Sequence, residues 1–254
     1  MSIIALINNK GGVGKTTTAI HLADGASRAG KDVLLVDLDA QASASLALGC
    51  ERDNLEPSIG TVLYEDVPAD EVVRKAPGAD VDLLTGSESL KNADVRLAGE
   101  YGRERLLEEA LQPLEEKYDL IILDCPPSLS LLPVNAVVTS DWFIVPVEPH
   151  YLALEGIGSL LDTIESIKDG IGTAAELLGV VVTRADFRAK ATEQIIELIR
   201  EDHGKKVFDT VVRGNVRVSE ATSFGVSVFD HAPGSTGAEA YQALTEEVLE
   251  RLQK

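Results

Sequence analysis

The fold is decided by the stretch Asn8-Asn9-Lys10-Gly11-Gly12-Val13-Gly14-Lys15-Thr16-Thr17, which follows the apolar run Ile3–Ile7 and opens a helical segment. A strand, a glycine-rich turn and a helix start in this order are typical of a loop that binds phosphate groups. The glycines let backbone N–H groups surround phosphate oxygens without a clash from Cβ, and the helix N-terminus adds partial positive charge. We expect Lys15 to reach the β- and γ-phosphates of a nucleotide and the Thr16 hydroxyl to hold Mg²⁺.

The loop departs from the common phosphate-loop pattern at its first position. The pattern Gly-x-x-x-x-Gly-Lys-Ser/Thr requires a glycine where this chain has Asn9, and a second lysine, Lys10, follows. This variant resembles the deviant Walker A motif of the ParA, MinD and nitrogenase iron protein group of dimerising ATPases. The resemblance implies that Lys10 crosses a dimer interface to the partner's nucleotide. The residues that it implies for binding ATP or ADP in this loop are Lys10, Gly11, Gly12, Val13, Gly14, Lys15, Thr16 and Thr17. An ordinary glycine-rich turn with a solvated lysine is the alternative, which the order of strand, loop and helix disfavours.

Length and cysteine content limit the class of protein. The 254 residues suffice for one large α/β domain, and because no linker or repeat divides the chain, we expect a single domain over residues 1–254. Cys50 and Cys125 are too far apart to suggest a disulfide framework or a zinc site, and they lack the sequence contexts of the iron protein's cluster ligands. With no leader-like segment and no apolar run of membrane-spanning length, we expect a soluble cytoplasmic protein without a membrane anchor.

The net charge is strongly negative. The chain has 42 acidic and 23 basic residues, which gives a formal charge of -19. Disorder does not explain this composition, because 44% of the residues are hydrophobic and occur in periodic blocks. We interpret the charge as a halophilic adaptation, since the ions of a high-salt cytoplasm screen the self-repulsion of an acidic surface.

A second apolar run, Val33–Val36, is followed by the carboxylates of Asp37 and Asp39. Continuous apolar runs are typical of parallel strands buried on both faces, and such sheets bind ligands at the carboxyl ends of their strands. The segment Asp-x-Asp-x-Gln resembles the ParA signature Asp-x-Asp-Pro-Gln, with Ala40 in place of the proline, and differs from that of MinD, which lacks the glutamine. The resemblance implies that Asp39 orients the attacking water and that Asp37 supports the magnesium shell. Capping of the next helix by the two aspartates is the alternative.

A third strand is predicted over residues 118–124. Its apolar core ends in Asp124, and Pro126 and Pro127 then stop the strand. This arrangement is typical of a Walker B strand, whose carboxylate holds magnesium through water near Thr16. The ending Asp-x-Pro-Pro resembles that of ParA proteins.

Strands and helices alternate along the rest of the chain. Further strands are predicted over residues 81–84, 142–147 and 177–183, and helices over 16–29, 151–168 and 238–252. The alternation predicts an α/β fold of one domain, with a mostly parallel sheet flanked by helices on both faces. Together with the loop, it predicts a P-loop NTPase of the deviant Walker A type.

The final predicted helix, residues 238–252, has an acidic polar face that includes Glu246, Glu247 and Glu250. MinD proteins end in a basic amphipathic helix that targets membranes. Because the polar face here is acidic, we do not expect this helix to recruit the chain to a membrane.

Basic residues are concentrated between Arg184 and Arg217, where eight of them accompany six acidic residues. The segment around Arg213, Gly214 and Asn215 resembles the ParA stretch Ile-Pro-Arg-Asn-Val-Arg, which contributes to the adenine pocket. Arg213 replaces the usual proline and Gly214 the usual arginine, whereas Asn215 is retained. We assign Arg213 and Asn215 to the nucleotide site.

Three arginines are candidates for contacts with nonspecific DNA. Arg217 matches an arginine with this role in chromosomal ParA/Soj proteins, Arg188 falls near another, and Arg213 lies between them. The alternative is that these arginines neutralise local acids on a solvated surface.

The resemblance extends nearly end to end and identifies the chain as a member of the ParA/Soj partition ATPases. It implies Mg²⁺-dependent hydrolysis of ATP to ADP and phosphate, slow and stimulated by a ParB-like partner, as a switch for an ATP-bound homodimer that binds nonspecific DNA on the nucleoid. Lys10, Lys15 and Asp39 carry the catalysis in this interpretation. Two alternatives stay open: a MinD-like or cargo-positioning ATPase on a protein or membrane matrix, and a metabolic or assembly P-loop enzyme.

Overall fold

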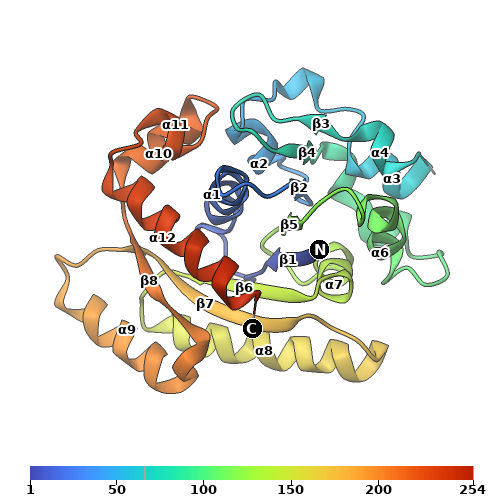
Figure 1. Cartoon of the computed structure of the whole chain (residues 1–254). Helices are drawn as coiled ribbons and strands as arrows, with labels where there is room; N and C mark the ends of the chain where they lie inside the picture. The colour runs from blue at the N-terminus through green and yellow to red at the C-terminus, as the bar shows by residue number, and fades with distance from the viewer. Residues whose placement is uncertain (66, 254) are drawn as a thin grey trace.

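Eight strands form one sheet in the computed structural model, which describes residues 1–65 and 67–253 (Figure 1). The strand order is β3-β4-β2-β5-β1-β6-β7-β8, and every neighbouring pair is parallel except β3 and β4. The strands are β1 (Ser2–Leu6), β2 (Val33–Asp37), β3 (Arg74–Lys75), β4 (Asp82–Leu84), β5 (Leu120–Asp124), β6 (Trp142–Val147), β7 (Glu176–Ala185) and β8 (Val207–Arg213). The predicted mostly parallel sheet is confirmed.

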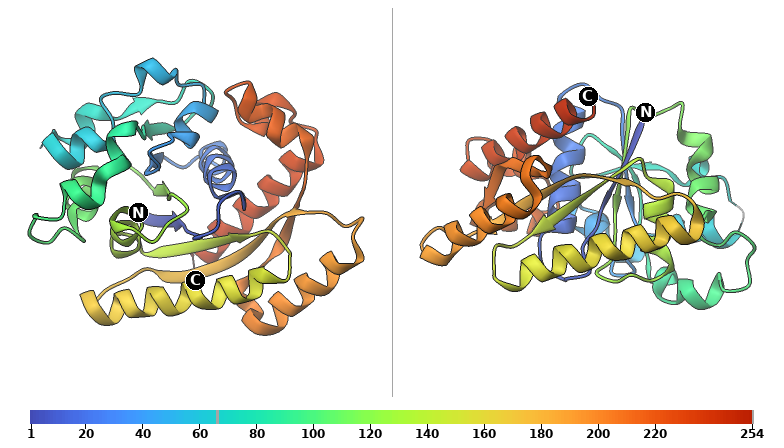
Figure 2. Two further views of the ribbon diagram at one scale, coloured as in Figure 1. Left: turned by 180° about the vertical axis from the view of Figure 1, so that it is seen from behind. Right: turned by 90° about the horizontal axis from the view of Figure 1, so that it is seen from below.

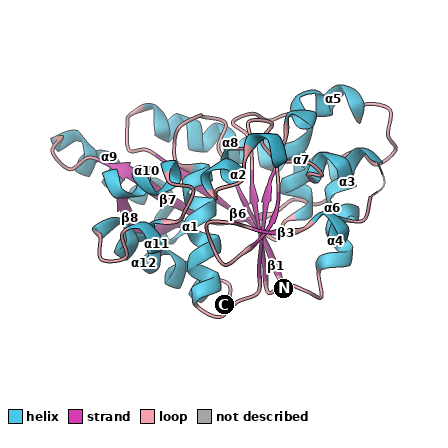
Figure 3. Cartoon of the chain, turned by 90° about the horizontal axis from the view of Figure 1, so that it is seen from above, coloured by secondary structure: helices cyan, strands magenta, loops and turns pink. Residues whose placement is uncertain are grey.

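Helices cover both faces of this sheet (Figures 2 and 3). One face carries α1 (Lys15–Arg28), α2 (Ser43–Ala47), α10 (Val216–Ser223), α11 (Val228–His231) and α12 (Thr236–Arg251). The other carries α3 (Ile59–Glu65), α4 (Ala69–Val72), α5 (Ala93–Arg96), α6 (Leu106–Leu111), α7 (Leu131–Thr139), α8 (Leu152–Ile171) and α9 (Lys190–His203). Short 3₁₀ turns occupy Arg52–Asn54, Glu88–Asn92, Gln112–Leu114 and Gly204–Lys206.

The apolar runs form strands because their side chains are buried on both faces. Successive residues of a strand point to opposite faces, so Ile3 and Ala5 pack in the core under α7 and α8, whereas Ile4 and Leu6 pack under α1 and α12. The ends of the three central strands are level, because Asp124 of β5 is in register with Leu6 of β1 and with Asp37 of β2. The fold therefore brings two carboxylates to the point where β1 enters the phosphate loop.

Two strands were not predicted from the sequence. Strand β8 forms one edge of the sheet, so it exposes Asp209 and interrupts the apolar pattern, and β3 is only two residues long. Glu247, which we expected on the exposed acidic face of the final helix, is largely buried in α12. Its carboxylate accepts hydrogen bonds from the backbone N–H groups of Asp209 and Thr210, at 2.9 and 3.1 Å, and therefore covers part of this edge.

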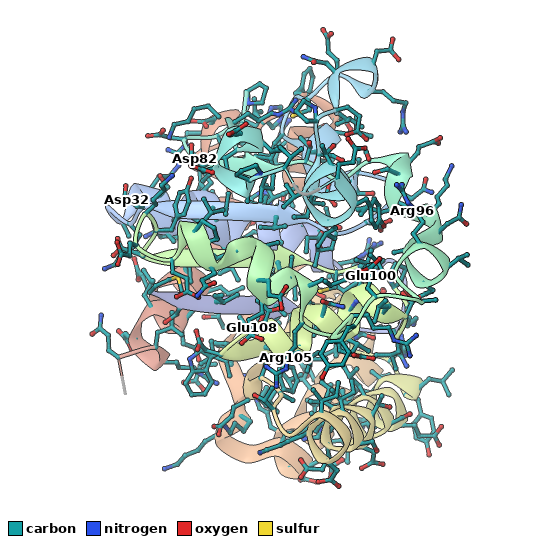
Figure 4. The ribbon with its side chains drawn as sticks, turned by 90° about the vertical axis from the view of Figure 1, so that its right-hand side faces the viewer. Asp32, Asp82, Arg96, Glu100, Arg105 and Glu108 are labelled. Carbon is teal, nitrogen blue, oxygen red and sulfur yellow. The ribbon has the colours of Figure 1, made fainter. Side chains whose placement is uncertain are left out.

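Most charged side chains lie on the surface, and some of the basic ones pair with neighbouring acids. Figure 4 shows the side of the molecule near α6, where Arg105 and Glu108 form an ion pair at 2.8 Å. Exposed pairs of this kind contribute little to stability, typically below ~1 kcal/mol. The negative charge therefore acts mainly through the field around the molecule rather than through individual contacts.

Candidate nucleotide site

The phosphate loop connects β1 to α1 and adopts a conformation that requires glycine. Gly12 and Gly14 have φ angles of 78° and 87°, in the left-handed region that side chains with a Cβ rarely adopt. Gly14 directly precedes the first turn of α1, so the backbone N–H groups at this end have no partner within the helix. The loop thus has the geometry of an anion-binding site at a helix N-terminus.

A cavity of about 950 Å³ opens beside this loop. It extends from the ends of β2 and β5 to the ends of β7 and β8. Of the residues selected from the sequence, its walls contain Gly11, Gly12, Gly14, Lys15, Thr16, Thr17, Asp39, Arg188, Arg213 and Asn215. The fold therefore brings together loop residues and C-terminal residues that are about 200 positions apart in the sequence.

The two loop lysines differ in their surroundings. Lys15 is buried, and its ammonium group donates a hydrogen bond to the carbonyl oxygen of Lys10 at 3.0 Å. Burial lowers the pKa of Lys15, and the nearby carboxylate of Asp124 acts in the opposite direction. Lys10 is exposed, and its own ammonium group contacts Nε2 of His150, two residues before α8.

Asp124 is a buried carboxylate without a partner. Neither of its oxygens accepts a hydrogen bond from the residues that the structure describes. Burial raises the pKa of Asp124 well above its usual value, and the neighbouring Asp37 raises it further. The Thr16 hydroxyl lies close enough to oppose this shift. A buried oxygen pair with free lone pairs needs a cation or a donor to complete it.

This donor set fits Mg²⁺. Magnesium is usually held by one or two carboxylates together with phosphate oxygens and waters, rather than by a cage made only of protein. Across residues 1–65 and 67–253, no cluster of three or more His, Cys, Asp or Glu side chains could hold a metal alone. Asp124 and the Thr16 hydroxyl would therefore hold the ion together with a bound nucleotide.

Asp37 has a different environment from Asp124, although their strands are adjacent. Its Oδ2 accepts hydrogen bonds from the backbone N–H and the hydroxyl of Ser45, at 2.9 and 2.8 Å, and its Oδ1 accepts from the N–H of Asp39 at 3.2 Å. Burial raises the pKa of Asp37 to about 6, and the bonds from Ser45 oppose the shift. Asp37 thus anchors the first turn of α2 and positions the backbone of Asp39, and its support of a magnesium shell stays a prediction.

Asp39 lies in the cavity wall, where it is available to a ligand. Its Oδ1 accepts a hydrogen bond from the N–H of Gln41 at 2.9 Å, which fixes the carboxylate relative to the turn before α2. The side chain is partly exposed, unlike those of Asp37 and Asp124. A carboxylate placed in this way can accept a proton or orient water next to bound phosphate.

His21, for which the sequence predicted no role, connects α1 to the C-terminal helices. The N–H of Val228 donates to Nε2 at 3.0 Å, so the proton lies on Nδ1, which donates to the carbonyl oxygen of Thr17 at 2.6 Å. The ring stacks on Tyr241 of α12 with a centroid distance of 4.4 Å. Burial lowers the pKa of His21 to about 4, so the ring is neutral at neutral pH. A lone histidine in an apolar helix carries no sequence signal for this role.

Comparison with known proteins places this site in a family. A family model described as an AAA domain matches residues 1–177. The chromosome-partitioning ATPase Soj of Thermus thermophilus is 44% identical over 252 residues, which cover 99% of this chain and 96% of that protein. The chain belongs to the ParA/Soj family of ATPases.

Solved structures agree with this assignment. A cobyrinic acid a,c-diamide synthase of Mycobacterium smegmatis, with a bound ATP analogue and magnesium, is 30% identical with a TM-score of 0.86, over 100% of this chain and 96% of that one. The cell division ATPase MinD of Pyrococcus furiosus is 26% identical with a TM-score of 0.79, over 98% of each chain. Relatives of this fold therefore bind adenine nucleotide and magnesium.

Arg213 and Asn215, which the resemblance to ParA/Soj proteins assigns to the nucleotide site, also contact other parts of the chain. The guanidinium of Arg213 lies 4.5 Å from the centre of the Phe187 ring. The Oδ1 of Asn215 caps α10 by accepting from the N–H of Arg217 at 2.8 Å, and its amide nitrogen donates to the Thr236 hydroxyl at 3.0 Å. Asn215 therefore has a structural role in addition to its position in the cavity wall.

The arginines selected as ParA/Soj DNA contacts are exposed, and two of them pair with acids. Arg188 is 91% exposed and bonds Asp186 at 2.7 Å, and Arg217 on α10 bonds Glu220 at 2.8 Å. The Asp186 carboxylate, whose pKa Arg188 lowers to about 2, stays charged at neutral pH. Arg188 and Arg217 thus neutralise local acids, and their contacts with DNA stay a prediction.

Two further residues of the site were missed. Thr183 and Arg184, at the end of β7, line the cavity and hydrogen bond to carbonyl groups of the phosphate loop. Their position at the carboxyl end of a predicted strand was a signal that could have identified them.

The apolar face of the final helix of this ParA/Soj member packs against the rest of the fold. Its apolar residues Ala238, Tyr241, Leu244 and Val248 are buried against α1 and the sheet. Among the described residues, no helix is long and apolar enough to cross a membrane.

Proposed function

We propose that this chain is a partition ATPase that binds Mg²⁺ and ATP at the loop between β1 and α1 and hydrolyses ATP slowly to ADP and phosphate. The observation that carries the proposal is the buried carboxylate of Asp124, which has no hydrogen-bond partner among the described residues and lies beside Thr16 and Lys15, two residues of the cavity wall. Asp124 and the Thr16 hydroxyl would hold Mg²⁺ together with the nucleotide, and the ion would supply positive charge that offsets the negative charge developing on the phosphate during hydrolysis. In this function Lys10, Lys15 and Asp39 are the catalytic residues.

Each residue has one task in the proposed reaction. Lys15 leaves the carbonyl oxygen of Lys10 and donates to phosphate oxygens, which are better acceptors because they are charged. The N–H groups of residues 11–17 bind the phosphates, as expected at a helix N-terminus. Asp39 orients the attacking water, and Asp37 keeps Asp39 in place through its backbone N–H.

We assign the switch to a homodimer formed in the ATP state. Lys10 is exposed and lies at the outer edge of the loop, so it is free to leave His150 and reach the nucleotide of a second copy. In hydrolysis, water attacks the γ-phosphorus, the bond to the oxygen of the leaving ADP breaks, and phosphate is released. The contact between Lys10 and the nucleotide of the second copy then ends, and with it the dimer. A ParB-like partner would accelerate this step, as the family resemblance implies.

Nonspecific DNA is the proposed matrix. Arg188 and Arg213 line the wall of the cavity, and Arg217 lies on α10 beside it. Two subunits would present two such sets on one face. Because Asp186 and Glu220 pair with two of these arginines, the free positive charge is small, and binding should weaken steeply with salt. A nucleoid-associated position in the cytoplasm follows from this proposal.

The net charge of -19 favours a high-salt habitat and a matrix with positive charge. In a high-salt cytoplasm, ions screen the repulsion between acidic side chains, so the acidic surface suits a halophilic habitat. The same charge favours a second matrix, namely a protein surface with basic residues, because such a surface attracts an acidic protein whereas DNA phosphates repel it.

One titration decides between these matrices. Binding to duplex DNA is measured across salt concentrations with ATP and with ADP, for the wild type, Arg217→Glu and Arg103→Glu. Arg103 is a matched control, because it also pairs with a neighbouring acid but lies on the opposite face. We expect binding only with ATP, steep salt dependence and loss in Arg217→Glu alone. If the ATP-bound protein does not bind duplex DNA even at low salt, the result supports the protein matrix instead.

A further inference from the structure

The end of β7 contacts the apex of the phosphate loop through two side chains. The Thr183 hydroxyl donates a hydrogen bond to the carbonyl oxygen of Val13 at 2.7 Å, and Nη1 of Arg184 donates to the carbonyl oxygen of Gly12 at 2.9 Å. Both side chains line the nucleotide cavity. Two consecutive carbonyl groups of the loop are therefore held from one side by consecutive residues of one strand.

Holding a carbonyl group also fixes the N–H group of the next residue. In a trans peptide the C=O and N–H bonds point in opposite directions. The bond from Arg184 to the Gly12 carbonyl therefore turns the N–H of Val13 away from β7. In the same way, the bond from Thr183 to the Val13 carbonyl turns the N–H of Gly14 away from β7. Both N–H groups then face the concave side of the loop, where a phosphate would bind.

Without such anchors these two peptide groups would rotate easily. Gly12 and Gly14 flank them, and glycine occupies positive and negative φ almost equally well. A Cβ built on Gly12 would meet no atom within 4 Å, so that side of the apex is open, whereas the Val13 side chain is buried. The hydrogen bonds from β7 therefore act together with the packing of Val13 to select one orientation of the two peptide groups.

The backbone of Arg184 adopts an unfavourable conformation at this point. Its φ is 52°, and among the described residues only Ala42 is another non-glycine residue with positive φ. Strained residues of this kind persist where the surrounding structure requires them, and they cluster at functional sites. This left-handed residue lies one position before the end of β7, and its guanidinium contacts the loop.

We propose that Arg184, assisted by Thr183, is a positioning residue that keeps the phosphate loop in its anion-binding shape before the nucleotide arrives. The inference rests on the proposed function, because it concerns the same site. The loop is then pre-organised equally for every ligand that carries a diphosphate. Loss of the clamp therefore weakens ADP, ATP and pyrophosphate by the same factor.

The test compares Arg184→Asn, Arg184→Lys and Arg200→Ala with the wild type. Asparagine tolerates positive φ, so the backbone turn is retained while the reach to Gly12 is lost. Lysine keeps a charged donor. Arg200 is the matched control, because it is an exposed arginine of α9 that also donates to a backbone carbonyl oxygen, that of Asp209, but does not contact the loop. Dissociation constants for ADP, a non-hydrolysable ATP analogue and pyrophosphate are measured with Mg²⁺, together with kcat and the melting temperature without ligand.

For Arg184→Asn we expect all three dissociation constants to rise about tenfold, as for the loss of one charge-assisted hydrogen bond. The kcat at saturating ATP and the ligand-free melting temperature should be unchanged, Arg184→Lys should recover part of the affinity, and Arg200→Ala should match the wild type. Unchanged constants in Arg184→Asn overturn the proposal. A loss confined to the ATP analogue also overturns it, because Arg184 would then be a ligand of the γ-phosphate.

The proposed function and the clamp can fail separately. If the wild type binds neither nucleotide, the proposed function fails. The pyrophosphate titration then decides the clamp by itself, since pyrophosphate needs the loop but no base site. Equal pyrophosphate binding by the wild type and Arg184→Asn overturns the clamp, and weaker binding by Arg184→Asn supports it.

Discussion

The ammonium group of Lys15 donates a hydrogen bond at 3.0 Å to the backbone carbonyl oxygen of Lys10, five residues earlier in the same loop. The contact closes the loop around a buried cation whose pKa is lowered by burial. A nucleotide must therefore offer Lys15 better acceptors than this carbonyl. Phosphate oxygens meet that requirement because charge-assisted hydrogen bonds are roughly twice as strong as neutral ones.

Lys10→Ala should leave nucleotide affinity nearly unchanged but abolish ATP-dependent dimers. The Lys10 side chain is exposed and contacts His150, whereas the local phosphates belong to Lys15. Light scattering with ATP and with ADP measures the dimer fraction. His150→Ala is the control, because it frees Lys10 without removing it and should still dimerise. A Lys10→Ala protein that dimerises fully with ATP removes the crossing role from Lys10.

Asp39→Ala should bind ATP and accumulate as the dimer, because only the orientation of water is lost. We expect the single-turnover rate to fall on the order of 100-fold, which is typical for a positioned acid or base. Lys15→Ala should fail earlier, at ATP binding, since it removes the buried ammonium group. Nucleotide titration and single-turnover hydrolysis separate the two variants. Wild-type turnover in Asp39→Ala would exclude Asp39 from the chemical step.

Asp124→Asn should be more stable than the wild type in the absence of Mg²⁺ and nucleotide. Burial and Asp37 raise the pKa of Asp124, so its ionised form opposes folding at neutral pH, and both oxygens lack partners among the described residues. Replacing an unpaired buried charge should raise the free energy of unfolding by about 1–2 kcal/mol. Hydrolysis should be lost.

Urea unfolding with a chelator and an ATPase assay test the effect of Asp124→Asn. Glu116→Gln, which removes one charge from an exposed position, is the control and should change neither property. A less stable Asp124→Asn protein would contradict the destabilising effect of the buried carboxylate. ATP hydrolysis by this variant would contradict the metal role of Asp124.

The buried His21 should make stability depend on pH below about 6.5. Its pKa is about 4 in the folded protein and ~6.5 in the unfolded chain, so between these values the unfolded chain binds more protons. Stability from the neutral ring is therefore present above pH 6.5 and is lost as the pH falls. Between pH 7.5 and pH 5.0 the loss should be about 2 kcal/mol.

The measurement compares wild type with His21→Gln by urea unfolding at both pH values. Asp37, whose pKa is raised to about 6, shifts stability in the opposite direction, but it is present in both proteins and cancels. The stability advantage of the wild type should shrink by that amount at pH 5.0. A constant difference between the two proteins would show that His21 is not buried as a neutral ring.

The phosphate loop and the central strands could be predicted because their signals are local. A strand buried on both faces leaves an uninterrupted apolar run, as in Val33–Val36, and a carboxylate directly after it must lie at the ligand-binding edge of the sheet. From the residue pattern alone, these rules place Asp37, Asp39 and Asp124 near the loop. Strand β8 was not predicted, because an edge strand exposes residues such as Asp209 and its apolar run is interrupted.

The environment of each carboxylate could not be predicted, because it depends on contacts across the fold. The same strand-end position makes Asp37 an acceptor of three hydrogen bonds and leaves Asp124 without any from the part of the chain that is described. The contact between Arg184 and Gly12 spans 172 positions and depends on a left-handed backbone turn. Neither a residue type nor a spacing records such a turn.

The cavity wall combines residues 11–43 from the start of the chain with residues 183–241 from its end. A nucleotide that touches both parts would act as a reversible cross-link between segments that the unfolded chain keeps far apart. Because only the folded chain offers both parts, nucleotide at 100 times its dissociation constant would add ~2.7 kcal/mol to the free energy of unfolding. The resistance of the purified protein to proteolysis should therefore rise with the concentration of nucleotide.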